Sequence, residues 1–209
     1  MKGTWLRICG FMGGLLFLLA GCGERKADAA MDAYEQLLSG DLSLLNEGDL
    51  SAWALDSWMD ILLASGELEY ACLDLDGDGV DELLLQWIGD PGSYNGVFHY
   101  DGGQIRCWQS DGMEASCRDY PLRDGTMVRQ YDFNGTRSYT LFRYRPDGSQ
   151  ETAASLFARE ERIPEDSPEP CPYYRVNGEE VGAADFQTQF DSLITQQLLE
   201  PSAWTCAQH

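Results

Sequence analysis

The chain has 209 residues, and its 14 basic side chains face 35 acidic ones, giving a formal net charge of -21. So acidic a chain is excluded from the nucleic-acid-binding proteins, because neutralising phosphates requires a basic face. Hydrophobic residues make up 44% and aromatic residues 11% of the chain, which supports a packed core and excludes wholesale disorder. The length suits one domain with an attached tethering segment.

The first 22 residues have the organisation of an export signal. Lys2 and Arg7 form a short basic start, and residues 8–20 are apolar and rich in Leu, Phe, Met and Gly. As a helix, this apolar stretch rises only about 20 Å against about 30 Å for the hydrocarbon core of a bilayer, so it is too short for a permanent span. The pattern predicts a signal peptide over residues 1–21.

The signal ends in Leu19-Ala20-Gly21-Cys22. These residues resemble the lipobox of bacterial lipoproteins, which implies cleavage before Cys22 and attachment of lipid, palmitate included, to that cysteine. The resemblance places the chain outside the cytosol, anchored to the outer face of the bacterial cytoplasmic membrane. Cleavage removes two of the 14 basic side chains and none of the acidic ones, so acyl chains rather than charge would hold the protein at anionic lipid. The alternative is an ordinary secretory signal in which Cys22 is incidental.

Five cysteines remain once Cys9 leaves with the signal and Cys22 is assigned to lipid. They allow at most two disulfides and one leftover thiol. Cys107 and Cys117 flank residues 110–113, a plausible turn, so they could pair across a hairpin outside the cytosol. An anaerobic habitat would instead leave all five reduced. The five are Cys72, Cys107, Cys117, Cys171 and Cys206.

Helical spacing of apolar residues predicts three helices. The first covers residues 27–38 and overlaps the end of a small polar tether at 22–30. The second covers residues 51–64, with Ser51 as its N-cap, and the third covers residues 183–199 near the end of the chain. Their apolar faces are Met31, Tyr34 and Leu38; Leu55, Trp58, Met59, Leu62 and Leu63; and Phe186, Phe190, Leu193, Ile194 and Leu198.

Between the second and third helices the pattern is that of antiparallel strands. Asp-Gly and Asn-Gly pairs recur between short apolar segments and supply the positive φ angles that tight hairpins need. We therefore predict an α+β domain over residues 31–209, with helices packed on one antiparallel β-meander of five to six strands. Residues 159–172, rich in Glu and Pro, are expected to form an exposed linker. The expected strand segments are 68–73, 83–88, 96–100, 104–108, 126–132, 137–145 and 151–158, with a small hairpin at 173–181.

One acidic loop carries a recognisable chemistry. It reads Asp74-Leu75-Asp76-Gly77-Asp78-Gly79-Val80-Asp81-Glu82. Three carboxylates on alternate residues, bent by glycine into a tight loop, can point at one centre. Hard oxygen ligands in that number suit Ca²⁺ better than zinc or copper. The alternative is a solvated acidic turn without a metal.

The first six positions of this loop resemble an EF-hand, but the twelfth, where an EF-hand has its bidentate Glu, is Leu85. Both flanks also have strand character. The loop is more similar to the calcium hairpins of integrin-propeller-type (FG-GAP) repeats and related bacterial surface proteins. That resemblance covers about a dozen residues, supports a metal loop rather than a propeller, and implies that Asp81 points outward. The implied metal ligands are Asp74, Asp76, Asp78, the carbonyl of Val80, and Glu82.

Signals for catalysis are sparse. The mature chain has two histidines, His99 and the terminal His209. A Cys/His nucleophile would have to combine His99 with a thiol such as Cys72, and a half-buried strand histidine is the simpler interpretation. Zinc-ligand spacings, a phosphate-binding glycine loop and a nucleophile elbow are absent from the sequence, so we predict no catalytic residue. Acid pairs for glycoside cleavage stay open, because sequence does not show their separation.

The layout of lipobox, short helices, one calcium hairpin, β-meander and final helix resembles surface lipoproteins of gut-dwelling Gram-positive bacteria. That family implies no activity of its own. We predict a non-enzymatic, calcium-stapled surface module that binds an extracellular ligand or protein and reaches the membrane through lipid on Cys22. The alternatives are an extracellular carboxylate-dependent hydrolase acting on envelope or dietary polymer, and a subunit of another envelope complex. A groove of exposed aromatics would favour ligand binding; the candidates are Trp87, Tyr94, Tyr100 and Trp108.

Overall fold

The structure is a computed structural model that describes residues 13–55, 59, 66–88, 94–112, 116–161, 165 and 168–207. Side chains are described from residue 25 onward within these ranges, apart from residues 94, 95, 111 and 112. Most of the predicted signal and the side chain of Cys22 therefore lie outside the described residues. In the part of the chain that the structure describes, no helix is long and apolar enough to span a membrane.

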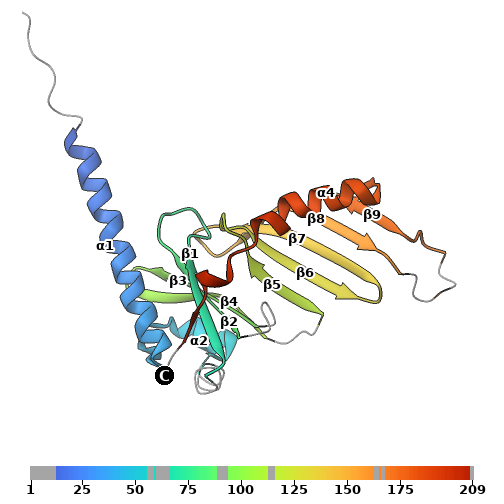
Figure 1. Ribbon diagram of the computed structural model, residues 1–209. Coiled ribbons are helices and arrows are strands. Elements are labelled where there is room, and N and C mark those ends of the chain that lie inside the picture. The colour runs from blue at the N-terminus through green and yellow to red at the C-terminus, as the bar shows by residue number, and fades with distance from the viewer. Residues whose placement is uncertain are drawn as a thin grey trace, which may run out of the picture.

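The predicted α+β class, with helices before and after antiparallel strands, is confirmed (Figure 1). The strands form two antiparallel sheets, of five and six strands, where we expected one. The first sheet has the order β11-β1-β2-β3-β4. Its strands are β1 (Leu68–Leu73), β2 (Glu82–Trp87), β3 (Tyr94–Asp101), β4 (Gln104–Gly112) and β11 (Thr205–Cys206).

The second sheet has the order β10-β9-β8-β7-β6-β5, so it is a meander in which each strand pairs with its sequence neighbours. The sequence pattern missed β5 here and β11 in the first sheet, because strands this short show little periodicity. The strands are β5 (Cys117–Pro121), β6 (Met127–Phe133), β7 (Thr136–Tyr144), β8 (Gln150–Arg159), β9 (Tyr173–Val176) and β10 (Glu179–Val181).

The first helix, α1 (Gly13–Leu38), is continuous through the segment that we predicted as a tether (Figure 1). Its buried face consists of Ala30, Ala33, Tyr34 and Leu37, whereas Met31 is 38% exposed. Of the predicted face, Tyr34 is buried and Leu38 packs against the core, whereas Met31 was wrong. Small alanines, rather than methionine, allow the helix backbone to approach the first sheet. Residues 22–30 therefore extend this helix instead of forming a flexible connection.

The second helix begins earlier than predicted. After the 3₁₀ turn η1 (Leu42–Leu44), helix α2 (Glu47–Trp53) is capped by Asn46, whose side chain accepts from the amides of Gly48 and Asp49. Ser51 therefore lies within the helix and not at its N-cap. Leu55 and Met59, from the predicted apolar face, are helical and fully buried. Residues 56–58 and 60–65, including Trp58, Leu62 and Leu63, lie outside the described residues.

The C-terminal helix is shorter than predicted. Helix α4 (Ala183–Leu193) ends at Leu193, and two 3₁₀ turns follow, η2 (Thr195–Gln197) and η3 (Pro201–Ala203). Of the predicted apolar face, Phe186 and Ile194 are buried, whereas Leu198 is 42% exposed. The helix lies along one face of the second sheet (Figure 1).

Three apolar clusters hold these layers together. The first lies between α1 and the first sheet, and the second lies between α4 and the second sheet. The third joins the two sheets. It contains Leu75 from the acidic loop and Leu84 and Val97 from the first sheet, packed with Met127, Phe142 and Tyr144 from the second.

The predicted pairing of Cys107 with Cys117 is wrong. Cys107 lies opposite Phe98 in the first sheet, and Cys117 lies opposite Tyr131 in the second. Residues 110–112 continue strand β4 instead of turning. All five cysteines counted above are thiols.

The predicted linker at 159–172 is largely exposed where the structure describes it. Residue 159 ends β8 and is half-buried, and each described residue from 160 to 170 is exposed. The linker therefore begins one residue after the start that we predicted.

Candidate metal centre

The acidic loop joins two paired strands, as the sequence indicated. Leu73 ends β1, Glu82 begins β2, and these two residues lie opposite each other in the antiparallel register. Gly77 and Gly79 have φ angles of 81° and 84°, which side chains rarely tolerate. The glycines thus let the chain fold back on itself within the loop.

The three aspartates of the loop converge. One carboxylate oxygen from each of Asp74, Asp76 and Asp78 lies within 4.8 Å of the others. Backbone amides of the same loop hold them: Gly77 donates to Asp74 Oδ1 at 2.7 Å and Gly79 to Asp74 Oδ2 at 3.1 Å. The amide of residue 78 donates to Asp76 Oδ1 at 2.9 Å. Each carboxylate is therefore fixed by the local fold, in the manner of an Asx turn.

The carboxylate of Asp76 is only partly hydrogen-bonded within the described part of the chain. Its Oδ2 is buried and has no hydrogen-bond donor among the described residues. Burial raises the pKa of Asp76, and the neighbouring charges of Asp78 and Asp74 raise it further. A buried acceptor without a donor costs about 1–3 kcal/mol, so this oxygen needs a proton, a water or a cation.

Glu82 lies beneath the loop and is fully buried. Its Oε2 accepts from the amide of Leu75 at 2.8 Å, and its Oε1 is 2.8 Å from Nδ1 of His99. Burial raises the pKa of Glu82, although the hydrogen bonds from His99 and Leu75 oppose that shift. A carboxylate oxygen has two lone pairs, so these bonds leave capacity for a cation.

Sequence reasoning placed His99 on a strand but did not connect it with the acidic loop. It lies on β3, is 4% exposed, and joins Asp76 and Glu82 in a second group whose ligand atoms lie within 4.8 Å of one another. The β2–β3 register, which pairs Leu83 with Phe98, brings it there. The alternation of side chains along a buried strand was the one available signal, and it could not identify the partner strand.

Val80 and Asp81 complete the loop. The amide of Val80 donates to Asp78 Oδ1 at 2.8 Å, and its side chain is buried; its carbonyl as a metal ligand stays a prediction. Asp81 is exposed, and its carbonyl accepts from the hydroxyl of Tyr34 on α1 at 3.1 Å.

A second contact from α1 reaches the loop itself. Nζ of Lys26 lies 2.5 Å from Oδ2 of Asp78, and the hydrogen bond to Asp78 raises the pKa of Lys26. Burial raises the pKa of Asp78, but bonds from Lys26 and Val80 outweigh it and leave the pKa of this carboxyl below its ordinary value. Lys26, the one lysine after residue 2, therefore supplies positive charge at the mouth of the loop.

The second sheet supports the loop from below. Gly125, in the turn between β5 and β6, lies so close that a Cβ there would be 2.4 Å from the carbonyl oxygen of Asp74. Trp108 stacks on His99 at 4.4 Å between ring centroids and on Tyr144 at 5.1 Å. The loop is thus part of the junction between the sheets, rather than a free surface turn.

The donor set is dominated by oxygen. Three other carboxylates and one imidazole gather around Asp76, and hard oxygen donors in this number favour Ca²⁺. Without positive charge these carboxylates repel one another. Comparison of this chain with protein-family models, with curated proteins and with solved structures found no match.

The exposed aromatic groove that we considered does not form at the expected residues. Trp87 and Tyr100 pack against the core beneath α1, and Trp108 packs at the sheet junction. The side chain of Tyr94 lies outside the described residues.

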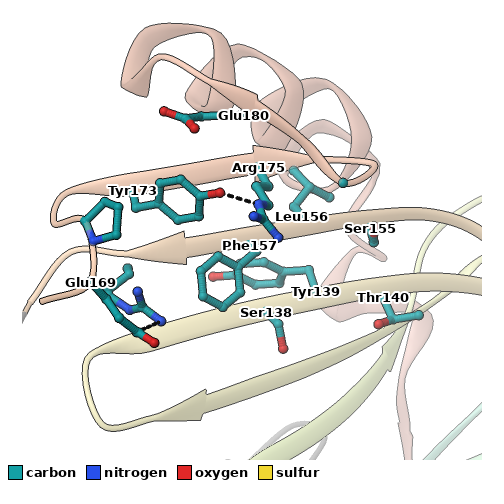
Figure 2. A pocket seen from close by; sticks show the side chains of 13 residues that line it. Ser138, Tyr139, Thr140, Ser155, Leu156, Phe157, Glu169, Tyr173, Arg175 and Glu180 are labelled. Atoms are coloured by element: carbon teal, nitrogen blue, oxygen red, sulfur yellow. Dashed lines mark hydrogen bonds and ion pairs between the residues drawn. The ribbon is translucent and has the colours of Figure 1, made fainter. Parts of the chain in front are cut away.

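An aromatic surface exists instead on the face of the second sheet that turns away from α4. There a cavity of about 680 Å³ is lined by Phe157, Tyr173, Arg159 and Arg175, among others (Figure 2). Arg159 pairs with Glu169 at 2.6 Å, and Arg175 donates to the hydroxyl of Tyr173. Its arginines are therefore already engaged within the protein.

Proposed function

We propose that this protein is an exported, lipid-anchored module whose fold is stapled by one Ca²⁺ and which binds a ligand or protein partner outside the cytosol. The observation that carries the metal proposal is the convergence of Asp74, Asp76 and Asp78 on one centre above Glu82, with Asp76 Oδ2 buried and without a donor. A cation at this point would satisfy that oxygen and offset the repulsion among four carboxylates.

A structural role for the ion agrees with the position of the loop. Leu75, within the loop, is buried in the cluster between the sheets, and Gly125 contacts the backbone of Asp74. A cation that fixes the loop would therefore also fix the junction between the two sheets. Extracellular calcium sites with affinities of about 10⁻⁴–10⁻³ M serve such purposes where calcium is plentiful.

Lipid on Cys22 would place the metal loop near the membrane. Residues 13–38 form one helix, and Lys26 of that helix contacts Asp78. Four residues separate Cys22 from Lys26, a rise of about 6 Å along a helix. Calcium would then lie within reach of anionic headgroups. Its positive charge would reduce the repulsion between those headgroups and this acidic protein.

Thermal unfolding with calcium and with chelator tests the metal proposal. At a free calcium concentration a hundredfold above Kd, the ion adds about 2.7 kcal/mol to the free energy of unfolding, because it binds the folded state alone. Asp76→Asn should abolish most of this gain. Asp81→Asn is the matched control, since Asp81 is exposed, and it should retain the gain.

Two results would overturn the proposal. One is an unfolding midpoint that calcium does not move in the unsubstituted protein. The other is equal loss of the calcium effect in both variants, which would indicate screening of acidic charge rather than a site. The non-enzymatic part is tested separately by incubation with glycans and peptidoglycan, where a processed product would favour the hydrolase alternative.

A further inference from the structure

A second cavity lies where the two sheets meet, and it contains none of the proposed metal ligands. Its volume is about 470 Å³, within the range of small-molecule sites in proteins. Strands β1 and β2 of the first sheet, β5 and β6 of the second, and the segment after α4 all contribute to its walls. The lining residues are Glu69, Gln86, Arg118, Tyr120, Pro121, Gln130, Leu198, Leu199, Pro201 and Trp204.

Gln86 provides an independent sign that this cavity takes a ligand. It is 2% exposed, and its Oε1 has no hydrogen-bond donor among the described residues. Its Nε2 donates to Oε1 of Glu69 at 2.8 Å. Exchanging the amide oxygen and nitrogen would turn an acceptor toward the carboxylate, so the orientation with the orphaned oxygen is the favourable one.

The polar end of the cavity is rich in acceptors. Glu69 and Gln86 lie opposite each other in the β1–β2 register, so both side chains leave the same face of the sheet. An ionised carboxylate accepts hydrogen bonds and cannot donate them. The carboxylate and the orphaned amide oxygen together therefore call for a ligand group that donates several hydrogen bonds and carries positive charge.

Another part of the lining is apolar. Leu199 and Trp204 are half-buried, and Leu198, at 42% exposure, lies at the rim. Tyr120 lines the cavity, and its hydroxyl donates to Oε1 of Gln130 at 3.5 Å. An aromatic or branched apolar body would fill this part, since apolar walls with a few placed polar groups are typical of such sites.

We propose that the junction cavity binds a small organic amine, with its ammonium group at Glu69 and Gln86 and an apolar body against Trp204. This site goes beyond the metal staple and stands without it. It would give the module a ligand chemistry that the sequence does not reveal, because its walls come from segments over 130 residues apart, Glu69 and Trp204 among them.

Three probes of similar shape test the proposal: 2-phenylethylammonium, 2-phenylethanol and 3-phenylpropionate. The readout is the indole signal of Trp204 in a ¹H–¹⁵N spectrum, assigned with Trp204→Phe, in saturating calcium. We expect the amine to bind with Kd of about 1 mM or tighter, and the acid to bind at least about tenfold more weakly because of Glu69. Arg118 also lines the cavity but has an interaction partner of its own, so the acid tests whether its guanidinium group can take a ligand.

Variants assign the binding to this cavity. Glu69→Gln should weaken amine binding about tenfold, and Gln86→Leu should weaken it about fivefold by removing an acceptor. Because Gln86 is buried and its variant can fail to fold, Leu198→Ser at the exposed rim serves as a second test of the apolar wall. Glu35→Gln, exposed on α1, is the matched control for a lost negative charge and should bind as the unsubstituted protein does.

Three outcomes would overturn the proposal. No probe shifts the Trp204 signal up to about 10 mM, in which case an ordered water alone serves Gln86. The acid binds as tightly as the amine, which would assign the site to anions. Glu69→Gln and Glu35→Gln weaken binding equally, which would indicate general attraction of a cation to an acidic protein. None of these outcomes bears on the calcium response of the loop.

Discussion

The β1–β2 hairpin and the β6–β7 hairpin close by different means. Between β6 and β7, Asn134 and Gly135 both have positive φ angles, and Phe133 pairs directly with Thr136. Positive φ angles at both residues close this turn without converging charges, and the amide of Glu160 donates to the carbonyl of Gly135. The β1–β2 loop instead brings carboxylates together above a buried Glu82, so its closure depends on groups from elsewhere.

Those groups come from three directions. Lys26 reaches the loop from α1, His99 from β3, and Gly125 from the second sheet. A hairpin of this kind depends on its neighbours for stability. Its conformation therefore depends on whether the rest of the protein is folded. The difference predicts that ions affect the β1–β2 loop more than the β6–β7 turn.

The largest expected effect is steric. Gly125→Ala would place a Cβ 2.4 Å from the carbonyl oxygen of Asp74, at a φ of 81°. We expect it to lower the free energy of unfolding by about 3 kcal/mol, combining overpacking with a strained backbone. Gly178→Ala is the control, because its φ is 82° but nothing lies within 4 Å of the added Cβ. It should cost about 1 kcal/mol. Equal losses in urea unfolding would show that the loop does not rest on the second sheet.

Removal of calcium should change the hydrogen-exchange rates of the β1–β2 loop but not those of the β6–β7 hairpin. The amides of Gly77, Gly79 and Val80 donate to loop carboxylates, and a bound ion would hold those carboxylates in place. Chelation should accelerate exchange of these amides by up to about a hundredfold. The amides that pair β6 with β7 should keep their rates. Equal acceleration in both hairpins would mean that calcium stabilises the whole fold without a local site.

Much of the metal loop follows from local sequence, and this is why it could be predicted. Alternating aspartates with intervening glycines determine their own convergence, and Asp74, Asp76 and Asp78 do meet. The contributions of Lys26 and His99 could not be predicted in this way. They depend on helix docking and on the β2–β3 register, which no short motif encodes.

The division into two sheets was not predicted from the sequence, although one feature of the sequence pointed to a second layer. Leu83, Leu84 and Leu85 are consecutive and all buried, so β2 is covered on both faces, as a strand between two layers must be. Leu83 and Leu85 face the cluster under α1, and Leu84 faces the second sheet. A run of leucines after the loop thus indicated a second layer, but not that the layer is another sheet.

Replacing Glu82 with a neutral side chain is expected to change stability in chelator and calcium affinity in opposite directions. Burial raises the pKa of Glu82, so without an ion the charged carboxylate is less favourable in the folded chain than in the unfolded chain. We expect Glu82→Gln to raise the stability of the chelated protein by about 1 kcal/mol, because less charge is buried. The same change should weaken calcium binding by at least about tenfold. Calorimetric titration and chelated unfolding measure the two effects, and a loss in both would assign Glu82 to packing alone.

The smallest expected effect is the pH dependence of the chelated protein. The pKa values of Asp76 and Glu82 are raised in the folded state, in each case by burial first. The unfolded chain therefore loses these protons at lower pH than the folded chain does. As pH rises from about 4 through the raised pKa values, these groups should lower the free energy of unfolding.

Other carboxyls, such as Asp124 with its lowered pKa, contribute with the opposite sign, so the total pH profile mixes both. The informative quantity is the stability of the unsubstituted protein minus that of Glu82→Gln, measured in chelator at each pH. This difference should fall as pH rises from about 4, and saturating calcium should remove the fall because the ion binds the ionised carboxylates. If the difference rises with pH instead, Glu82 is stabilised as an anion by His99 and the loop needs no cation beneath it.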